Sequence, residues 1–372
     1  MAIITWCNQN INYGQVLQAY AMQRNVKKYG FDPIIINYRK LEEREESLLS
    51  KNKYIRQLYE WYRGLEKAGT SYIRTKLKFN KFVHDYVNLS YPCYTKSEIE
   101  ELVGLHNCKY LICGSDQIWN PACFDPVYYL DFFNNSKDIC RIAYAPSVAE
   151  DNINTRNQHI FIKMTKLINQ IDYVSVREED SAKILRKLTD KTVVSLLDPT
   201  FLISKKGWDK IAKKNMCKER YIFCYILGDL KQHRNNIRKL SNKYNTEKVI
   251  YLNTHNNGNY TNEDFLNNIG PREFVTLIKY SEAIYTDSFH GIALSINLNK
   301  EFYACKRYNV SAYNKKSRIT NILGIFGLEN RYIDIKGCIN DDRLDYIPVN
   351  KILKSERKKS FTFLDKAFKN RK

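Results

Sequence analysis

Short apolar segments alternate along the chain with longer segments in which apolar residues recur at helical spacing. Near the start, AIITW is typical of a strand, VLQAYAMQRNVKKYG of an amphipathic helix ending at Gly30, and PIIINY of a second strand. These three segments form one β–α–β unit. The alternation predicts an α/β protein with largely parallel sheets.

The same alternation occurs in two series. The first series continues with strands near 109–114, 141–147, 172–176 and 192–199 and a helix over 178–188. The second begins near Phe201, with strands near 220–228, 248–253, 283–287 and 301–305 and helices over 233–245, 271–281 and 288–299. We therefore expect two Rossmann-like domains, 1–200 and 201–372, with ligands in the crevice between them, beyond the carboxyl ends of the strands.

The net charge of +20 predicts an anionic partner. The positive charge is concentrated in 51–87 and 351–372, where aromatic and aliphatic residues lie among lysines and arginines at helical spacing. We expect the first segment to belong to a basic helical insertion near 41–90, and the second to form a basic helix that packs back on the first domain. Such helices suit an anionic membrane face; the alternative is a solvated polar face opposite a core face.

Other features exclude classes of protein. No apolar run approaches the ~20 residues that span a bilayer, and the start lacks the pattern of a signal peptide. The ten cysteines are scattered without a C-x-x-C pair, and the histidines lack metal-ligand spacing. We expect a cytoplasmic protein with no disulfide framework, no metal and no cofactor. Nucleic-acid motifs are absent as well, so no nucleic-acid partner is expected.

The segment TDSFHG, 286–291, follows a strand and opens a helix. The free N–H groups and positive dipole end of a helix favour an anion. Gly291 would let the backbone approach the anion, Ser288 offers a hydroxyl, and His290 can bind a phosphate oxygen or transfer a proton. The alternative is a helix cap formed by Asp287 or Ser288, with a histidine bonded to a neighbouring loop.

Polar residues follow other strands too. Arg177 could hold a carboxylate or phosphate with two parallel bonds, or form a salt bridge to an acid of the next helix, Glu178, Glu179 or Asp180. In GSDQIWNP, Asp116 could orient or deprotonate a hydroxyl, whereas Trp119 could stack on a sugar or pack in the core. The expected acceptor-binding residues are Asn12, Tyr13, Gly14, Ser115, Asp116, Gln117 and Trp119.

Taken in order, these segments resemble the polysaccharide pyruvyl transferase family. The matching pieces extend from Ile3 to Arg331 and include ITWCNQNINYGQVLQAYAMQ, YLICGSDQIWNP, IAYAPSVA, VSVREEDSAKIL, LDPTFLI, TDSFHGIALSI and SRITNILGIFGLENR. The resemblance implies a GT-B-like architecture with the active site in the cleft between two Rossmann-like domains. It also implies transfer of a pyruvyl group from phosphoenolpyruvate to a sugar of a surface polysaccharide or its lipid-linked precursor, which forms a pyruvate ketal and releases phosphate.

The resemblance assigns roles to the motif residues. It points to Arg177 and His290 as donor-binding residues, and the chemistry then suits His290 as general acid and Asp116 as the carboxylate that helps the sugar hydroxyl. In some branches of the family an arginine stands where this chain has Ser288, so we expect Arg318, Lys316 or Lys315 to supply that charge. The first domain would then be the acceptor side and the second the donor side.

A cytoplasmic enzyme of this kind would meet a lipid-linked glycan at the inner face of the membrane, in peripheral contact with anionic lipid. Two other functions remain open from the sequence. One is a GT-B-type glycosyltransferase that uses a nucleotide sugar, and the other is a non-catalytic polyanion-binding protein.

Overall fold

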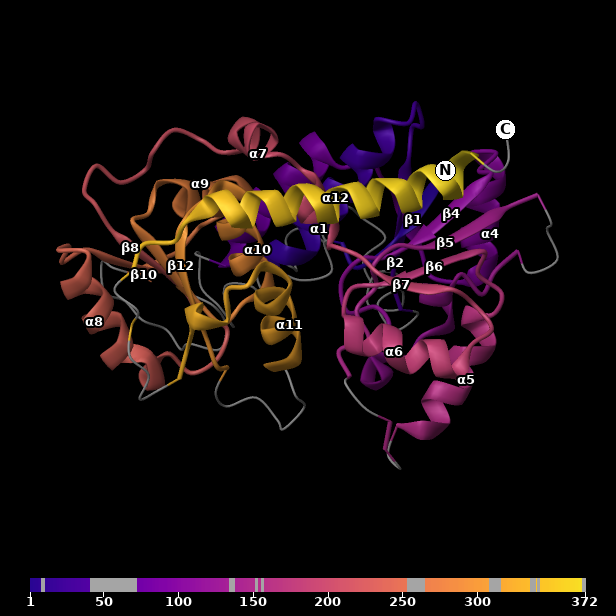
Figure 1. Cartoon of the computed structure of the whole chain (residues 1–372). Helices are drawn as coiled ribbons and strands as arrows, with labels where there is room; N and C mark the ends of the chain where they lie inside the picture. The colour runs from indigo at the N-terminus through magenta and orange to yellow at the C-terminus, as the bar shows by residue number, and fades with distance from the viewer. Residues whose placement is uncertain are drawn as a thin grey trace. The chain divides into compact units, whose positions relative to one another are not determined.

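The computed structural model describes the chain except residues 8–10, 41–71, 134–137, 151–152, 155–156, 253–264, 308–315, 335–338, 340–341 and 370–372. Residues 316 and 317 are described by their backbone alone. The chain divides into two compact units (Figure 1). Unit 1 comprises Met1–Pro199 and Phe361–Lys372, and unit 2 comprises Thr200–Ser360. Residues 361–372, which the predicted division places in the 201–372 domain, thus belong to unit 1.

Unit 1 contains a parallel sheet with strand order β3-β2-β1-β4-β5-β6-β7. Its strands are β1 Ala2–Ile4, β2 Ile34–Tyr38, β3 Leu89–Cys93, β4 Tyr110–Cys113, β5 Cys140–Ala143, β6 Tyr173–Val176 and β7 Val193–Ser195. Every residue of β1, β4 and β5 is buried, as expected for parallel strands covered on both faces. The continuous apolar runs of the sequence follow from this burial.

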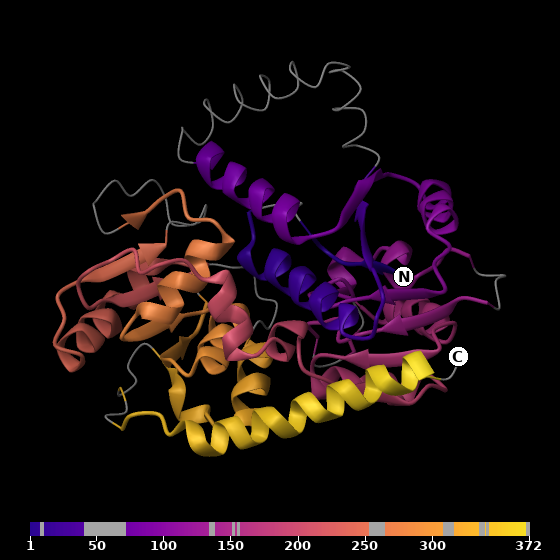
Figure 2. The same ribbon diagram turned by 90° about the horizontal axis from the view of Figure 1, so that it is seen from above.

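Helices cover both faces of this sheet. They are α1 Tyr13–Lys27, a helix over 72–86, α4 Lys96–Leu105, α5 Gln158–Ile168 and α6 Glu179–Leu188, with 3-10 turns η1 Pro121–Cys123 and η2 Pro126–Tyr129. One core cluster joins Ala2 and Ile4 to residues of α4, α5 and α6. In Figure 2 the helix over 72–86 lies alongside α1, and Tyr20 contacts Phe82 and Tyr86 edge to face.

Unit 2 contains a second parallel sheet with strand order β10-β9-β8-β11-β12-β13. Its strands are β8 Ile222–Tyr225, β9 Val249–Leu252, β10 Phe265–Leu266, β11 Ala283–Thr286, β12 Glu301–Cys305 and β13 Tyr332–Ile333. Alternate strand residues face opposite sides of the sheet. Cys224 and Tyr285 lie in a cluster with α8, whereas Phe223 and Tyr225 contact Phe274 of α9.

The helices of unit 2 are α7 Lys205–Ile211, α8 Arg234–Lys243, α9 Pro271–Tyr280, α10 Phe289–Leu298 and α11 Lys316–Phe326, with 3-10 turns η3 Pro199–Leu202, η4 Leu230–His233 and η5 Glu329–Arg331. All residues of α10 are buried. This helix is apolar on all sides, which is the sequence pattern of a helix in the centre of a core. The segment that begins at the TDSFHG motif is therefore held rigidly by packing.

The last helix, α12 Tyr346–Lys369, begins in unit 2 and ends in unit 1. Its apolar side is buried at Leu353 and Leu364. In unit 1 its Phe368 ring contacts Phe31 and Tyr110. The basic C-terminal segment is thus a helix with an occupied apolar face, as in the alternative reading of its sequence.

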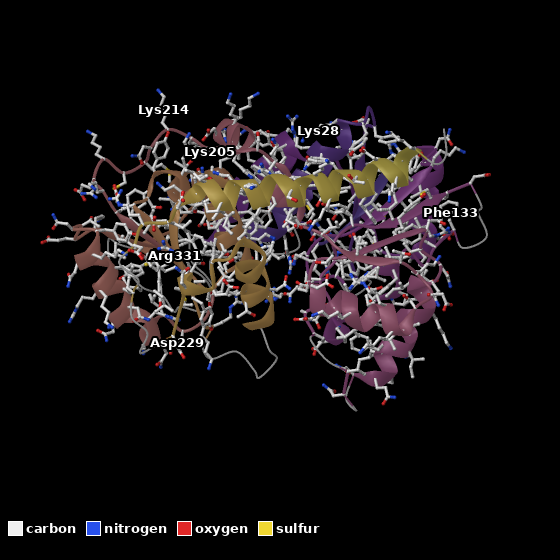
Figure 3. The ribbon with its side chains drawn as sticks, viewed as in Figure 1. Lys28, Phe133, Lys205, Lys214, Asp229 and Arg331 are labelled. Atoms are coloured by element: carbon white, nitrogen blue, oxygen red, sulfur yellow. The ribbon has the colours of Figure 1, made fainter. Side chains whose placement is uncertain are left out.

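The predicted strands and helices are found close to their expected positions. The sequence pattern missed β3, α4, α5, α7 and α11 as separate elements, and the expected basic insertion lies largely in 41–71, outside the described residues. Lys205 and Lys214 are exposed on unit 2 (Figure 3), whereas Arg331 is buried and bonded to Glu301.

Candidate functional site

Each sheet has one point at which the strand order reverses direction. In unit 1 this switch point lies between β1 and β4, and in unit 2 it lies between β8 and β11. Connections leave the sheet in opposite directions there, which opens a crevice at the carboxyl ends of the two strands and makes it the usual ligand site of such sheets. The segments GSDQIWNP and TDSFHG follow β4 and β11, so each motif lies at a switch point.

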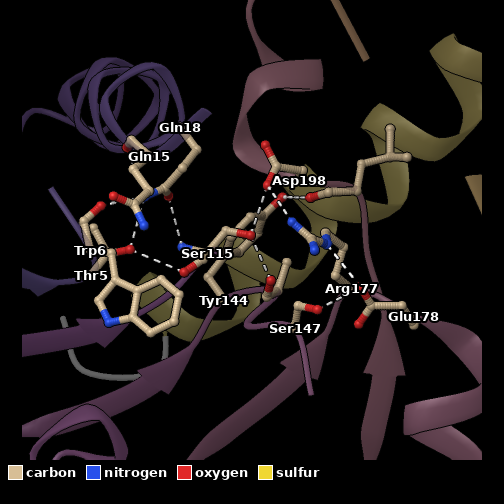
Figure 4. Close-up of polar contacts among 12 residues, drawn as sticks. Thr5, Trp6, Gln15, Gln18, Ser115, Tyr144, Ser147, Arg177, Glu178 and Asp198 are labelled. Carbon is tan, nitrogen blue, oxygen red and sulfur yellow. Dashed lines mark hydrogen bonds and ion pairs between the residues drawn. The ribbon is translucent and has the colours of Figure 1, made fainter. Parts of the chain in front are cut away.

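In unit 1 the switch point is fixed by a buried polar network (Figure 4). Gln18 of α1 donates from Nε2 to Thr5 Oγ1 at 2.9 Å and accepts from the Ser115 N–H at 3.0 Å. Thr5 donates to the Ser115 carbonyl at 3.0 Å. These bonds tie α1 and the end of β1 to the loop after β4, so this loop is held in one position.

Gly114 makes the same loop possible. Its φ is +118°, and a Cβ atom there would lie 2.0 Å from the Tyr144 carbonyl oxygen. No side chain can be accommodated at that distance, so close approach of β4 to the end of β5 requires glycine. Gly114 thus serves the close packing of the protein's own chain.

Arg177 lies at the end of β6 and is almost completely buried, with an exposure of 3%. Its Nε donates to Glu178 Oε1 at 3.0 Å and its Nη1 to Asp198 Oδ2 at 3.4 Å. Burial acts to lower the pKa of Arg177, but Glu178, Asp198 and Asp116 raise it above its ordinary value. The salt bridge to Glu178, one of the two predicted readings, is present. The expected two-bond clamp on a donor carboxylate stays a prediction.

Asp198 and Glu178 continue the network to two serines. Ser115 Oγ donates to Asp198 Oδ2 at 2.9 Å, and Ser147 Oγ donates to Glu178 Oε1 at 2.7 Å. Asp198 is fully buried, so its negative charge must be stabilised by these donors in place of water. The serine predicted to contact an acceptor, Ser115, is thus fully buried and bonded within the protein.

Asp116 has a positive φ of 64°, and its carbonyl accepts from the Ser147 N–H at 2.7 Å. Its side chain is 6% exposed, and within the described part of the chain no hydrogen bond or ion pair holds its carboxylate. Three carboxylates, those of Asp116, Glu178 and Asp198, therefore surround one guanidinium. This edge of unit 1 suits proton transfer from a hydroxyl better than attraction of an anion.

The other expected acceptor residues have structural roles. Trp119 is fully buried, its ring stacks on Tyr129 at 5.0 Å, and its Nε1 donates to the Tyr128 carbonyl. The prediction that Trp119 stacks on a sugar is wrong, because no part of its ring is accessible. Asn12 caps α1 by accepting from the Gln15 N–H.

Tyr13 and Gly14 are buried in the first turn of α1, where Tyr13 packs on Phe79 at 4.9 Å between ring centres. Gln117 is half-buried in the loop after β4. Of the predicted acceptor residues, Gln117 is partly accessible at the switch point and Asn12 is exposed at the start of α1, whereas Asp116 is buried.

In unit 2 the switch point is built by Thr286 and Ser288. Thr286 Oγ1 donates to the Tyr225 carbonyl at 2.6 Å and accepts from the Ser288 N–H at 3.0 Å. Ser288 is the N-cap of α10 and accepts from the Gly291 N–H at 3.4 Å. A Cβ atom at Gly291 would lie 2.8 Å from Thr286 Oγ1. Gly291 therefore permits contact between α10 and the strand that precedes it, and its expected role of admitting an anion stays a prediction.

Asp287 holds the neighbouring loop instead of capping the helix. Its Oδ1 accepts from the Leu227 N–H at 2.8 Å and its Oδ2 from the Gly228 N–H at 2.9 Å. Arg307 completes the arrangement, with Nε donating to Asp287 Oδ2 at 3.1 Å and Nη2 to the Asp287 carbonyl at 2.9 Å. The loop after β8, the start of α10 and the segment after β12 are thus joined at one carboxylate.

Arg307 is the cation that the sequence reading missed at this edge. Its side chain is 15% exposed, and two of its five N–H donors are used, so within the described residues three N–H bonds remain without a partner. Arg318 is half-buried in the first turn of α11, and the side chain of Lys316 and all of Lys315 lie outside the described part. That Arg318, Lys316 or Lys315 supplies the charge of the missing arginine at Ser288 stays a prediction; Arg307 is a further candidate, because it bonds to Asp287, the residue before Ser288.

His290 is the second residue of α10, 9% exposed, with its ring edge-on to Phe289 at 5.2 Å. It shares the switch point with Ser288 and Arg307. A helix start, a histidine and an arginine with open donors can bind an oxyanion and pass a proton to a bound group. The two switch points thus differ, because three carboxylates surround Arg177 in unit 1, whereas one arginine, Arg307, pairs with one carboxylate, Asp287, in unit 2.

Sequence reasoning also missed Gln18 and Asp198. Asp198 could have been found from the motif LDPTFLI, since an aspartate follows the last strand of the first series. Gln18 carries no such signal, because a glutamine inside a helix is ordinary. Arg307 could have been found because it closely follows β12, the strand next to β11.

Fold and sites together define the class of the protein as an α/β protein with two Rossmann-like parallel sheets of the GT-B type. UDP-GlcNAc 2-epimerase from Methanocaldococcus jannaschii is similar in structure, with a TM-score of 0.52, 12% identity and coverage of 95% of this chain and 90% of that one. So is Arabidopsis thaliana UGT89C1 complexed with UDP-L-rhamnose, with a TM-score of 0.52, 8% identity and coverage of 98% and 97%. At these identities the likeness shows the fold alone.

The family is shown by the sequence. The profile of the family described as polysaccharide pyruvyl transferase matches residues 12–307. This range is more than half of the chain, and it includes both switch-point motifs. The chain belongs to the polysaccharide pyruvyl transferase family. No curated protein matches it as a relative.

Two further observations concern the described part of the chain only. None of its helices combines the length and apolar character needed to cross a bilayer. Within the same residues, no three histidine, cysteine, aspartate or glutamate side chains are grouped for a metal ion.

Proposed function

We propose that the chain transfers a pyruvyl group from phosphoenolpyruvate to a sugar of a surface polysaccharide or of its lipid-linked precursor. The product is a pyruvate ketal bridging two sugar hydroxyls, and phosphate is released. The observation that carries the proposal is the family match over residues 12–307, with His290 and Arg307 placed together at the switch point of unit 2. Family membership supports pyruvyl transfer, and the chemistry of the switch points supports the donor.

In this proposal unit 2 binds the donor. Phosphoenolpyruvate carries a phosphate and a carboxylate, so it needs cationic groups and N–H donors. Arg307 offers open N–H bonds, and the start of α10 contributes its positive dipole end. Arg307, fixed by two bonds to Asp287, is thus pre-organised for the phosphate, and His290 lies at the same helix start.

Unit 1 supplies the carboxylate that activates the acceptor. Asp116 accepts the proton of the attacking sugar hydroxyl, because its carboxylate is not held by a hydrogen bond among the described residues. The positive charge of Arg177 stabilises the negative charge of Asp116 without a hydrogen bond between them. We therefore assign Arg177 an electrostatic and positioning role. The predicted binding of the donor carboxylate by Arg177 is a second role, with which its ion pairs to Glu178 and Asp198 compete.

The steps balance as follows. His290 donates a proton to the methylene carbon of the donor, which becomes a methyl group and leaves positive charge at the central carbon. A sugar hydroxyl attacks that carbon and loses its proton to Asp116. The bond to the phosphate oxygen then breaks, phosphate leaves, and the second hydroxyl closes the ketal with loss of its proton. No redox partner, metal or cofactor enters these steps.

The test is to incubate the protein with phosphoenolpyruvate and candidate glycans and to follow glycan mass and phosphate release. We expect a gain of one pyruvate unit per phosphate released, and a loss of ~100- to 10,000-fold in rate for His290→Ala. Phosphate release without a ketal, or His290→Ala with the rate of the unmodified protein, would contradict the proposed chemistry.

A membrane-bound acceptor would explain the basic face of α12. Lys351, Lys354 and Lys358 are exposed on this helix, whereas Leu353 is buried. Because the apolar side is occupied, contact with anionic lipid would be electrostatic and without insertion. Co-sedimentation with anionic vesicles should therefore be lost at high salt; binding that survives 1 M salt would indicate another mode.

A further inference from the structure

Gln15 carries a side-chain amide that the described part of the protein leaves unbonded. Four amide side chains of α1 are buried, those of Gln15, Gln18, Gln23 and Asn25. The last three are bonded through both the oxygen and the nitrogen of the amide. The Oε1 atom of Gln15 is enclosed and has no hydrogen-bond partner among the described residues. An enclosed oxygen without a donor is unfavourable, so it requires an explanation.

Gln15 lies at the switch point of unit 1. It is the third residue of α1, the helix that follows β1. Its carbonyl oxygen and that of Trp6 both accept from the Gln18 Nε2, at 3.1 Å and 3.2 Å, so the backbones of Gln15 and Trp6 lie side by side (Figure 4). Gln18 also accepts from the Ser115 N–H, so this pair adjoins the loop that carries Asp116. The unbonded amide is thus placed at the edge of the sheet where the acceptor is proposed to bind.

The two ends of the Gln15 amide differ in access. The nitrogen also makes no hydrogen bond with a described residue, but unlike the oxygen it is not enclosed. The last torsion of a glutamine side chain is broad and roughly two-fold, so rotation of the amide brings the oxygen to the open side. A group that enters from that side meets one hydrogen-bond acceptor and two donors.

Trp6 provides an apolar surface beside this amide. It comes two residues after the end of β1, and its ring lies edge-on to Tyr128 with 6.3 Å between the ring centres. Trp6 is half-buried, whereas Trp119 in the loop after β4 is fully buried. Of these two tryptophans, Trp6 is therefore the one that a ligand can reach.

A neutral sugar matches both features. Each sugar hydroxyl can donate and accept a hydrogen bond, so it can bond to an amide through either end. The face of a sugar ring carries C–H groups, which pack on the apolar surface of an indole. An anion fits less well, because the guanidinium of Arg177 is already bonded to Glu178 and Asp198.

We propose that Gln15 and Trp6 form the sugar subsite of the acceptor, with the Gln15 amide bonded to a sugar hydroxyl and the Trp6 ring against the sugar face. The inference rests on the proposed function, because this sugar is the acceptor of the proposed pyruvyl transfer. A site that bonds a substrate hydroxyl rejects analogues that lack it, so Gln15 contributes to the choice of acceptor. Gln15 binds the sugar and takes up no proton in the proposed steps.

The test compares Gln15→Met with the unmodified protein in both binding and stability. The probes are the methyl glycosides of glucose, galactose, mannose and N-acetylglucosamine, each titrated with the full chain and followed by ligand-observed NMR. At least one glycoside should bind, and Gln15→Met should weaken its binding about three- to tenfold, the effect of one neutral hydrogen bond. The urea midpoint of Gln15→Met should not fall, because methionine replaces an oxygen that has no donor.

Two other variants are the controls. Gln170→Met removes an exposed amide shortly before β6, at the amino edge of the same sheet, so it should leave glycoside binding within about twofold. Gln18→Met removes the bonds to Thr5 and Ser115, so its urea midpoint should fall. The pair of glutamines on α1 thus separates a binding role from a structural one.

The outcomes also separate the subsite from the reaction. Glycoside binding that depends on Gln15, without any pyruvyl transfer from phosphoenolpyruvate, would support the subsite and contradict the proposed reaction. Equal glycoside affinity in Gln15→Met and the unmodified protein, or no binding of any of these glycosides, would overturn the subsite. A fall in the urea midpoint of Gln15→Met as large as that of Gln18→Met would overturn it too, because Gln15 would then be a structural residue.

Discussion

The ion pairs of Arg177 lead to a prediction about the stability of unit 1. In Arg177→Met, a side chain of similar length loses the charge that faces Glu178 and Asp198. Both carboxylates are buried, with exposures of 5% and 0%, so each is left in a poorly solvated position without its cation. Removal of one partner of a buried pair costs about 3–5 kcal/mol, a large part of the ~5–15 kcal/mol that stabilises a typical domain.

The control uses an exposed pair in the same unit. Arg186 and Glu179 are joined at 2.7 Å, and each side chain is 41% exposed. For Arg186→Met we expect a loss below about 1 kcal/mol, because water screens such a pair. Urea unfolding followed by circular dichroism measures both variants, and the ratio of the two losses decides whether burial makes the difference. A loss below about 1 kcal/mol in Arg177→Met, or equal losses in the two variants, would refute the assignment of these buried ion pairs.

Three other predictions follow from single residues. Gly291→Ala should destabilise unit 2 by about 1–2 kcal/mol in urea unfolding, because a Cβ atom 2.8 Å from Thr286 Oγ1 costs more than the helix propensity of alanine restores; a more stable variant would contradict this packing. Burial lowers the pKa of His233, so the folded state resists its protonation and the free energy of unfolding should fall as pH drops below about 6.5. In His233→Gln this part of the pH dependence should vanish, and an unaltered pH profile in that variant would contradict the role given to His233. Exposed Cys123 should react rapidly with a thiol reagent, whereas buried Cys113, whose pKa is raised by burial, should react only on unfolding. If the fast phase of the reaction had the same rate and size in Cys123→Ser as in the unmodified protein, the assignment of that phase to Cys123 would be wrong.

The fold was predictable because parallel strands buried on both faces leave continuous apolar runs in the sequence. Segments such as YLIC and AIYT stand out between helices, and so do the motifs that follow them. The strand β3, LSYPC, was not predictable, because it contains Pro92 and is half-exposed at the edge of the sheet. Its pairing with β2 decides its structure.

The candidate site was only partly predictable. TDSFHG marks the switch point of unit 2, but its local pattern does not tell which acid caps the helix. Ser288 does so, because Asp287 is drawn to the N–H groups of Leu227 and Gly228, about sixty residues earlier in the chain. Such long-range bonds leave no periodic signal in the sequence.

The same limit explains Arg307 and Trp119. Arg307 reaches Asp287 because β11 and β12 are neighbours, which only the strand order reveals. Trp119 follows a strand end, as a ligand-stacking residue would, yet it packs on Tyr129 in the core. Position along the chain suggested a ligand-binding role for Trp119 and none for Arg307, and in both cases the three-dimensional packing determines the contacts.

The central claim is that the switch point of unit 2 binds phosphoenolpyruvate through Arg307. An equilibrium titration of the full chain with phosphoenolpyruvate, and separately with UDP, tests it most directly, with Lys306→Gln as a control that removes a neighbouring exposed charge. We expect phosphoenolpyruvate to bind, Arg307→Gln to weaken it about tenfold or more, and Lys306→Gln to have little effect. Binding of UDP without phosphoenolpyruvate, or undiminished phosphoenolpyruvate affinity in Arg307→Gln, would contradict the account.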